Sequence, residues 1–386
     1  YNYSERTVSD LFADIKEKGL LNTWKERSMW NDMRMSDRDI SDVTGAAYTY
    51  LINGNTPEQG WQALFKAGEK VRLRLINAAA MTIFDVRIPG LKMTVVASDG
   101  QNIQPVTVDE FRMGVAETYD VIVEPEVGNA YCVYAQNIDR TGFVAGSLTS
   151  DASLVAAIPD MDPAPILGHG DMGMDHSSMD HGSMDHGAMD HGSMEHGGVA
   201  ALGLAGHGSQ AEIKHVKTEF GPQVDMRAEM PQNGLSDPGI GLREHQQLYG
   251  RKVLTYADIK GLHPTRDKRQ PSREIQLHLT GNMHRYMWSI NGVKFTDAEP
   301  LVLEYGERVR ITLVNDTMMT HPMHLHGMWS ELETGDPEFI PRKHTVIVQP
   351  GAKVSYLVTA DAKGHWAYHC HLLYHMPGMF IKVLVK

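Results

Sequence analysis

The sequence lacks three features that define large classes of protein. Only two cysteines occur among 386 residues, so a fold stabilised by disulfides is not expected. No apolar run approaches the roughly twenty residues that a membrane-spanning helix needs, and no membrane span is expected. The net charge of −12 leaves no basic stripe for nucleic-acid phosphates, so nucleic acid is not an expected partner.

Histidine is plentiful, with 20 residues, and the most informative ones flank the second cysteine. The segment His369-Cys370-His371 places a sulfur ligand between two imidazoles, and His375 follows four residues later. Successive side chains of a strand point to opposite faces, so His369 and His371 share one face and Cys370 occupies the other. This parity predicts two metal sites on the two faces of one strand.

A second segment, residues 321–326 (HPMHLH), has the matching parity. Its last two histidines share a face, and His321 lies on the opposite one. Two imidazoles, a thiolate and a weak thioether form the trigonal type 1 copper site, which accepts single electrons. The candidate ligands of such a site are His321, Cys370 and His375, with Met379 as the axial thioether.

The remaining histidines of the two segments form a second candidate site. Imidazole serves both oxidation states of copper and suits a cluster that binds dioxygen. The candidate ligands are His324, His326, His369 and His371. An ordinary core or surface role explains one lone histidine, but not two clusters of matching parity. The pattern therefore predicts a copper oxidase.

The same segments resemble a known family. HPMHLHGMW and YHCHLLYHMPGMF are similar to the third-domain copper motifs of multicopper oxidases. NDTMMTHPMHLHGMW, FDVRIPGLKMTVVASDGQ and AETYDVIVEP resemble the periplasmic copper-resistance protein A group, and the resemblance covers nearly the whole chain apart from a variable middle. It implies a periplasmic enzyme of copper resistance, which oxidises Cu(I) or phenols by one electron and reduces dioxygen to water.

The resemblance also implies a role for each ligand. Type 1 copper would be bound by His321, Cys370 and His375. Type 2 copper would be bound by His324, and the binuclear type 3 pair by His326, His369 and His371. Electrons would pass from type 1 copper to the cluster through Cys370 and its two flanking histidines.

The axial position departs from the family pattern. The family usually has one more residue between the last histidine and the Gly-Met pair than HMPGM provides. Gly378-Met379 matches the family's ending, so Met379 is the expected axial ligand. Met376 is the alternative.

Half of the expected cluster ligands are not found in the sequence. The family takes them from two His-x-His pairs of a first domain, and both such triplets of this chain, residues 324–326 and 369–371, are already assigned. The chain opens at Tyr1 with no initiator Met and no apolar export segment. It is therefore interpreted as a C-terminal fragment whose partner is a missing N-terminal cupredoxin domain, so that type 1 copper is complete and the trinuclear site is half-supplied.

An internal repeat predicts the architecture. The ING and GExVR motifs at residues 52–54 and 68–72 recur, after an offset of 238 residues, at 290–292 and 306–310. Alternating apolar residues after each GExVR motif indicate a half-buried strand in both copies. The ligand histidines of the second copy correspond to the apolar residues Ile83, Val86 and Ile88 of the first.

We therefore expect an all-β chain of tandem cupredoxin-like Greek-key β-sandwich domains. The expected regions are a connector with a short, packed helix (1–44), a metal-free domain (45–158), a linker (159–269) and a copper-binding domain (270–386). Cys132 is expected to be a small core residue of a strand. Three acids near the copper motifs are expected to be solvated at the surface, namely Asp316, Glu331 and Asp336.

The linker contains a repeat of Met, an acid and His every five residues, from Met174 to His196. A period of five fits neither helix nor strand, and Gly and Ser fill the gaps, which predicts disorder. Thioether favours Cu(I) and imidazole takes either oxidation state, so weak capture of copper is favoured over a plain tether. Two further functions stay open, a copper-sequestering protein with secondary oxidase activity and a laccase-like phenol oxidase.

Overall fold

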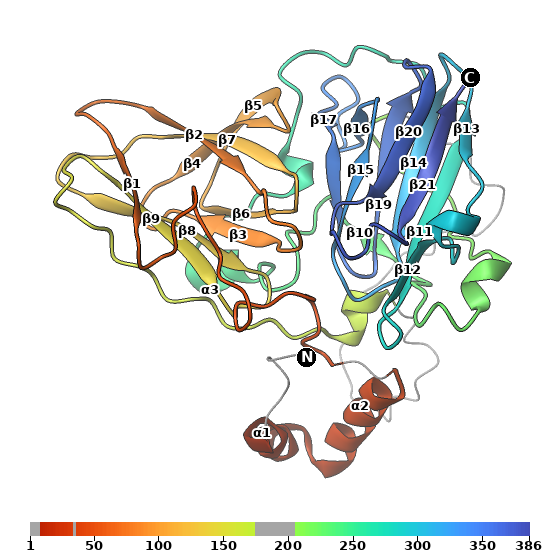
Figure 1. Cartoon of the computed structure of the whole chain (residues 1–386), viewed down its shortest axis with the longest axis horizontal. Coiled ribbons are helices and arrows are strands. Elements are labelled where there is room, and N and C mark those ends of the chain that lie inside the picture. Colours follow the sequence, from red (N-terminus) through yellow and green to blue (C-terminus); the bar gives the residue numbers. More distant parts are fainter. Residues whose placement is uncertain (1–7, 34–35, 174–204) are drawn as a thin grey trace, which may run out of the picture.

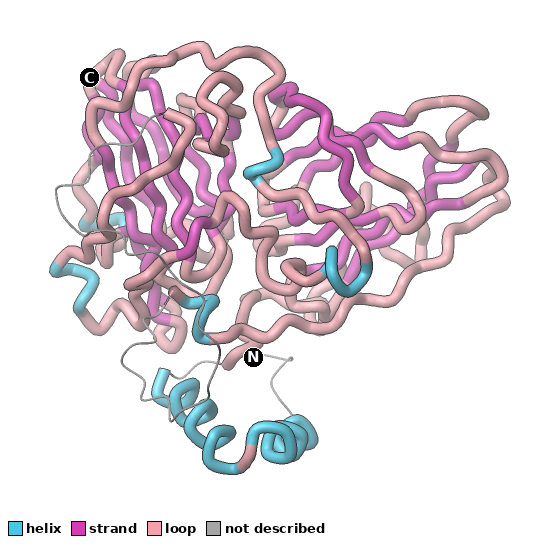
Figure 2. The backbone as a smooth tube through the Cα atoms, turned by 180° about the vertical axis from the view of Figure 1, so that it is seen from behind, coloured by secondary structure: helices cyan, strands magenta, loops and turns pink. Residues whose placement is uncertain are grey.

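The computed structural model describes residues 8–33, 36–173 and 205–386. Two β-sandwiches lie side by side, one in the first half of the chain and one in the second (Figure 1). Strands make up both bodies, whereas helices lie in the segments around them (Figure 2). The all-β expectation is confirmed.

Each layer of the first sandwich is one sheet. One sheet has the order β1-β9-β8-β3-β6, formed by Trp61–Leu64, Phe143–Thr149, Ala130–Asn137, Phe84–Arg87 and Glu110–Met113. The other has the order β2-β7-β4-β5, formed by Val71–Ile76, Thr118–Val123, Met93–Ser98 and Gln101–Val108. Apolar side chains such as Met93, Val95 and Val121 fill the space between them.

The second sandwich repeats this strand order and adds further strands to one of its sheets. One sheet is β13-β21-β20-β15-β18, formed by Leu301–Leu303, Phe380–Val385, Gly364–Cys370, His321–Leu325 and Thr345–Val348. The other is β12-β11-β14-β19-β16-β17, formed by Met287–Ile290, Glu274–Asn282, Arg308–Asn315, Ala352–Thr359, Ser330–Leu332 and Arg342–Lys343. A short strand, β10 (Gln232–Asn233), pairs with β19. The strands β15 and β20, which carry the histidines, are neighbours near the middle of their sheet.

The repeated strand is half-buried in one copy only. β2 alternates between half-buried and exposed residues as expected, whereas every residue of β14 is buried. The chain that follows residue 204 covers the outer face of the second sandwich, where the Ser209 amide donates to Ser355 Oγ over 3.1 Å. The Gln276 side chain likewise donates to the Glu212 carbonyl over 2.8 Å. Part of the expected linker is therefore packed against a sheet.

The N-terminal segment forms two helices. The apolar spacing of residues 8–15 produces α1 (Val8–Lys18), and Gly19, with a φ of +83°, separates it from α2 (Leu20–Met33). α1 is packed less tightly than expected: Leu11 and Ile15 are half-buried, but Val8 and Phe12 are exposed and no residue of the helix is buried. The shorter helices are η1 (His169–Met172), η3 (Lys217–Phe220), α3 (His245–Tyr249), η4 (Tyr256–Asp258) and η5 (Phe295–Asp297).

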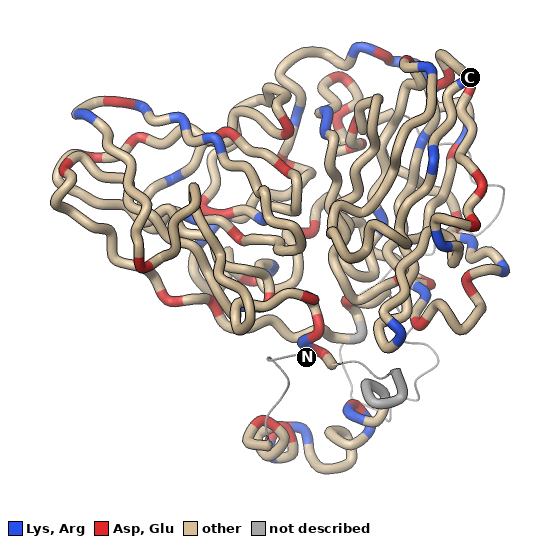
Figure 3. Tube along the Cα trace, in the orientation of Figure 1, with Lys and Arg blue, Asp and Glu red and all other residues tan. Residues whose placement is uncertain are grey.

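Within the described residues, no helix is both long and apolar enough to span a bilayer. Acidic and basic residues are interspersed along the loops of both sandwiches (Figure 3). The fold therefore presents mixed charge over most of its described length.

A buried lysine joins the two sandwiches. Nζ of Lys343, in β17, lies 3.0 Å from a carboxylate oxygen of Asp99 and 3.1 Å from one of Glu117, both in the first sandwich. Burial alone would lower the pKa of Lys343, but the two carboxylates outweigh burial and raise it above its ordinary value. The lysine therefore stays charged and ties the two bodies together.

Candidate metal centres

Strands β15 and β20 bring the two histidine segments together. They pair antiparallel, with Met323 opposite Cys370 and His324 opposite His369. Directly opposite residues share a face of the sheet, and the faces alternate along each strand. The register therefore places Cys370 and His321 on one face, and His324 and His369 on the other.

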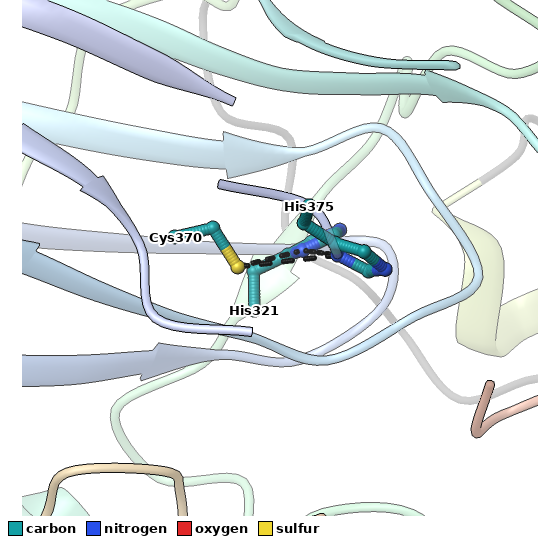
Figure 4. A group of neighbouring side chains, drawn as sticks. All are labelled: His321, Cys370 and His375. Carbon is teal, nitrogen blue, oxygen red and sulfur yellow. Dashed lines mark hydrogen bonds between the residues drawn. The ribbon is translucent and has the colours of Figure 1, made fainter. Parts of the chain in front are cut away.

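Three side chains converge on the first face (Figure 4). Sγ of Cys370 lies 3.6 Å from Nδ1 of His321 and 3.9 Å from Nδ1 of His375, and the two Nδ1 atoms are 3.2 Å apart. All three residues are fully buried. The turn after β20 returns His375 to the strand, because the amides of Gly378 and Met379 both donate to its carbonyl. The result is an enclosed triangle of two nitrogens and one sulfur, the donor set of type 1 copper.

The far nitrogen of each imidazole already has a partner. Nε2 of His375 donates to Oδ2 of Asp42 over 2.7 Å. Nε2 of His321 donates to the Thr317 hydroxyl over 2.7 Å, since that hydroxyl directs its own proton to Oδ1 of Asn315. Both Nδ1 atoms therefore turn a lone pair towards the centre of the triangle, where the thiol has one proton to share. This unmatched set of lone pairs fits a bound copper ion.

Burial sets the protonation of these groups. It lowers the pKa of His321 well below the ordinary value, with a further contribution from His375, and it also lowers the pKa of His375 despite the neighbouring Asp42. Burial raises the pKa of the Cys370 thiol, so a thiolate there needs a cation that displaces the proton. Trp288 stacks on His375 with ring centroids 3.7 Å apart and helps to enclose the centre.

The two axial candidates differ in how they are held. Met379 is fully buried, its carbonyl accepts from the Cys370 amide over 3.0 Å, and its amide donates to the His375 carbonyl over 2.8 Å. Met376 is half-buried one residue after His375. Met379 stays the axial candidate because its position is fixed by two of the proposed ligands.

Four imidazoles gather on the opposite face. Nε2 of His326 and Nε2 of His369 lie 3.1 Å apart. The ring of His324 has its centroid 5.7 Å from those of His369 and His371, which are 5.6 Å from each other. The four histidines of the second prediction are thus brought into one group.

Backbone carbonyls orient two of these rings. Nδ1 of His324 donates to the His344 carbonyl over 2.7 Å, and Nδ1 of His369 donates to the Cys370 carbonyl over 3.0 Å. Each Nε2 is then left with a lone pair for a metal. Burial lowers the pKa of His324 to about 4, which keeps it neutral near pH 7.

This second group is open to its surroundings, unlike the first. His326 is exposed, His324 and His371 are half-buried, and only His369 is buried. Four imidazoles come from the described residues at this face. Such an arrangement supplies half of the ligands that the resemblance implies for a trinuclear cluster.

Sequence reasoning missed the residues that hold the ligands in place. They are Asp42, Thr317, Trp288 and His344. Thr317 alone is close in sequence to the ligand it holds, since it lies four residues before His321 in the loop between β14 and β15. The others come from segments whose approach depends on the tertiary fold.

Two of the acids near the motifs are not at the surface, and that expectation was wrong. Asp316 and Glu331 are buried, and Glu331 pairs with Arg308 and Arg342, each 2.8 Å away. Asp336 is half-buried and pairs with Lys260 over 2.9 Å. The repeat from Met174 to His196 lies outside the described residues.

The turn that carries His375 rests on the first sandwich. The amide of Leu373 donates to the Ala80 carbonyl over 3.0 Å, and the amide of Tyr374 lies 3.2 Å from Sδ of Met81. Beside the turn, a cavity of about 800 Å³ is lined mainly by apolar residues of the first sandwich, with some polar ones such as Arg72 and Asn77, and by Tyr374. The cavity thus reaches the residue next to a proposed type 1 ligand.

Comparison with known proteins agrees with this geometry. Family models described as multicopper oxidase match residues 16–152 and 268–386. The copper resistance protein A homolog of Pseudomonas syringae pv. tomato is 55% identical over 395 residues, covering 100% of this chain and 66% of that protein. The chain belongs to the multicopper oxidase family, whose members are copper-dependent oxidoreductases.

A second relative places the chain near the copper resistance protein A members of this family. Copper resistance protein A of Escherichia coli is 52% identical over 412 residues, covering 100% of this chain and 67% of that protein. The chain thus spans about two thirds of the length of these curated relatives. The expected resemblance to the copper-resistance protein A group is confirmed.

Solved structures share the fold at low sequence identity. The crystal structure of Fet3p, a multicopper oxidase that functions in iron import, has a TM-score of 0.53 at 15% identity and covers 85% of this chain and 57% of that one. A laccase-like multicopper oxidase, CueO, from Ochrobactrum sp. has a TM-score of 0.52 at 16% identity, covering 88% and 60%. The tandem cupredoxin-like fold is therefore confirmed.

Proposed function

We propose that this chain provides the type 1 copper centre and half of the oxygen-reducing cluster of a copper-resistance multicopper oxidase. The second sandwich would be the copper-binding domain of residues 270–386, and the first the metal-free domain of residues 45–158. When bound, type 1 copper would take single electrons from Cu(I) or phenolic donors and the cluster would reduce dioxygen to water. The enclosed triangle of His321, Cys370 and His375 carries this proposal.

The residues of the chain have separate tasks in this proposal. Asp42 and Thr317 fix the two type 1 imidazoles with Nδ1 towards the ion. Trp288 and the surrounding core restrict the access of water. The peptide bonds on either side of Cys370 join this centre to His369 and His371, so a short covalent path links the two centres.

The open face of the second group supports an additional domain as partner. Four imidazoles from the described residues meet there, and His326 is exposed. An oxygen-reducing cluster of the family's type needs further imidazoles, and an exposed ligand needs a cover that excludes water. We infer that an N-terminal cupredoxin domain packs over this face and completes the cluster.

The proposed setting is the periplasm, where the enzyme would convert Cu(I) to the less harmful Cu(II). The support is the identity of over half with two relatives named copper resistance protein A. Sequestration of copper is the competing function, and the repeat from Met174 to His196 is the feature that favours it.

A laccase-like activity is the second candidate function. The cavity of about 800 Å³ beside the type 1 group favours it, because a mainly apolar cavity of this size admits a phenolic ring. Its wall includes Tyr374, adjacent to His375, so an organic donor bound there would lie close to a type 1 ligand.

Oxygen uptake tests these functions. The copper-loaded 386-residue chain is measured with Cu(I) and with 2,6-dimethoxyphenol. It is measured alone and after fusion to the third of the Pseudomonas relative that this chain does not span. The chain alone should be blue without catalytic uptake, and the fusion should consume oxygen. Sustained uptake by the chain alone contradicts the half-supplied cluster, and copper binding without uptake by the fusion leaves sequestration as the function. The ratio of the two donor rates separates a Cu(I) oxidase from a laccase.

A further inference from the structure

A second group of potential metal ligands lies away from both proposed copper centres. It consists of His278 in β11, Asp316 directly after β14, Glu219 in η3, and His215 just before η3. One ligand atom from each residue lies within 4.8 Å of all the others. Two of the four belong to the second sandwich, and two belong to the segment that covers its outer face.

The hydrogen bonds within this group pair each imidazole with a carboxylate. Nδ1 of His215 lies 2.7 Å from Oε2 of Glu219, and Nδ1 of His278 lies 2.8 Å from Oδ2 of Asp316. Nδ1 of His215 also lies 3.8 Å from Oδ2 of Asp316, and Nδ1 of His278 lies 3.5 Å from Oε2 of Glu219. Each imidazole nitrogen is therefore close to both carboxylates. The four groups therefore face one common point.

The charge of the group is not balanced by a permanent cation. Glu219 and Asp316 are both fully buried, and among the described residues no lysine or arginine lies within 4.0 Å of either carboxylate. Two buried carboxylates require compensation by positive charge. A bound cation of charge two would supply this charge at a single point that both carboxylates face.

Another cluster, in the first half of the chain and the segment packed on it, shows how such charges are balanced elsewhere. Glu110, Asp162 and His245 also lie within ligand distance of one another. There Arg251 lies 3.2 Å from Glu110 and 2.7 Å from Asp162, and Arg87 lies 3.9 Å from Asp162. In that cluster, an ion-pair network, arginines balance the carboxylates, whereas the group of His215, Glu219, His278 and Asp316 has no such arginine within 4.0 Å of its carboxylates among the described residues.

An unpartnered atom gives an independent indication of a ligand. Oε1 of Glu219 is buried without a hydrogen-bond partner among the described residues. The Glu219 side chain is 0% exposed, so bulk water does not reach this oxygen. A carboxylate that binds an ion through both oxygens would use Oε1, which is otherwise without a function.

We propose that His215, Glu219, His278 and Asp316 form a further metal site, which binds one divalent transition ion such as Zn(II) or Cu(II). Two imidazoles and two carboxylates are the mixed donor set of these ions, whereas Ca²⁺ and Mg²⁺ prefer oxygen alone and Cu(I) prefers sulfur. The ion neutralises both carboxylates. It also clamps the segment around η3 to the sheet formed by β11 and β14.

Zinc retention tests this proposal in the full chain. Metal-free protein is loaded with Zn(II), dialysed against a weak chelator, and analysed for zinc per chain. Glu219→Gln preserves the size and one oxygen of the side chain but removes its charge, and Glu110→Gln is the matched control in the ion-pair network. Zinc held elsewhere in the chain is common to all three proteins, so the difference between them reports this site.

The proposal expects Glu219→Gln to retain one zinc fewer than the wild type, or to bind that zinc at least about tenfold more weakly, and Glu110→Gln to match the wild type. Near-ultraviolet circular dichroism checks that each variant is folded. If Glu219→Gln does not fold, His215→Gln replaces it, because that side chain is 12% exposed and its loss disturbs the core less. Equal zinc content in wild type and variant, or an equal loss in the Glu110→Gln control, overturns the site and leaves an ion-pair network.

Discussion

The two sandwiches share the strand order of their five-stranded sheets, but only the second has the proposed metal ligands there. β3 and β8 of the first occupy the places of β15 and β20 in the second, each pair forming neighbours within an otherwise matching sheet. The residues of the first sandwich that correspond to His321, His324 and His326 are Ile83, Val86 and Ile88, and all three are buried. The fold itself therefore does not need the metal. The ligand residues that distinguish the second sandwich lie on two strands and on the turn that follows β20.

The comparison also shows what polar ligands need in order to stay buried. Apolar side chains at these positions contribute to the core directly through burial. Imidazoles at the same positions need hydrogen-bond partners and a metal, because an unpaired buried polar group costs about 1–3 kcal/mol. Asp42 and Thr317 supply those partners for the type 1 group, and the first sandwich has no corresponding requirement.

The largest expected effect separates the two cysteines, which lie in the matching strands β8 and β20. Cys370→Ser should abolish the intense red absorption of the copper-loaded chain, because an alcohol oxygen is a hard and weak substitute for thiolate. Cys132→Ser should retain it, since burial raises the pKa of the Cys132 thiol to about 11 and no imidazole of either centre contacts it among the described residues. Visible absorption after copper loading measures both. Loss of colour in Cys132→Ser, or its survival in Cys370→Ser, would show that the thiolate was misassigned.

The next largest effect should be on stability, from loss of the buried lysine that joins the two sandwiches. Lys343→Met leaves the carboxylates of Asp99 and Glu117 buried without their cation, which should cost about 3–5 kcal/mol of unfolding free energy. The exposed Lys66→Met, in a turn of the first sandwich, should change stability by less than about 0.5 kcal/mol. Urea unfolding of the metal-free chain compares them. Equal stability of both variants would mean that the sandwiches do not depend on this lysine.

A smaller effect on copper binding is expected from a change in Asp42, the hydrogen-bond partner of the proposed ligand His375. Asp42→Asn should weaken type 1 copper binding by about 10- to 100-fold, because the amide no longer fixes the His375 ring as the carboxylate does. Tyr286→Phe is the control, since it removes another hydrogen bond to the same oxygen of Asp42 and leaves His375 paired. Competition with a copper chelator gives both affinities. The idea fails if Asp42→Asn binds as tightly as Tyr286→Phe.

The smallest effect on the centres is expected from the Met/His repeat. Deletion of residues 174–196 should lower the number of bound copper ions and leave the red absorption unchanged, because the ligands around Cys370 remain. Binding by the repeat should weaken below about pH 6 as imidazoles protonate, while thioether binding of Cu(I) persists. Copper content at pH 7 and pH 5 measures this. Identical stoichiometry with and without the repeat would leave it as a plain tether.

The sequence predicted the fold and the grouping of the histidines because both depend on local periodicity. The alternation of His324 and His326 against His321 is a property of any strand, and the repeat offset revealed the second sandwich. The role of Asp42 was not predictable, because its approach to His375 depends on how a distant segment crosses the molecule. Asp316 was misjudged for the same reason, since its burial depends on a covering segment that is far away in the sequence.

The contacts of Leu373 and Tyr374 with Ala80 and Met81 limit how such proteins can be recombined. The turn carrying His375 is anchored on the copy of the sandwich that has no copper ligands. That copy cannot be exchanged for an unrelated sandwich, or removed to make a minimal copper protein, without releasing the turn. The smallest transferable unit is therefore the pair of sandwiches.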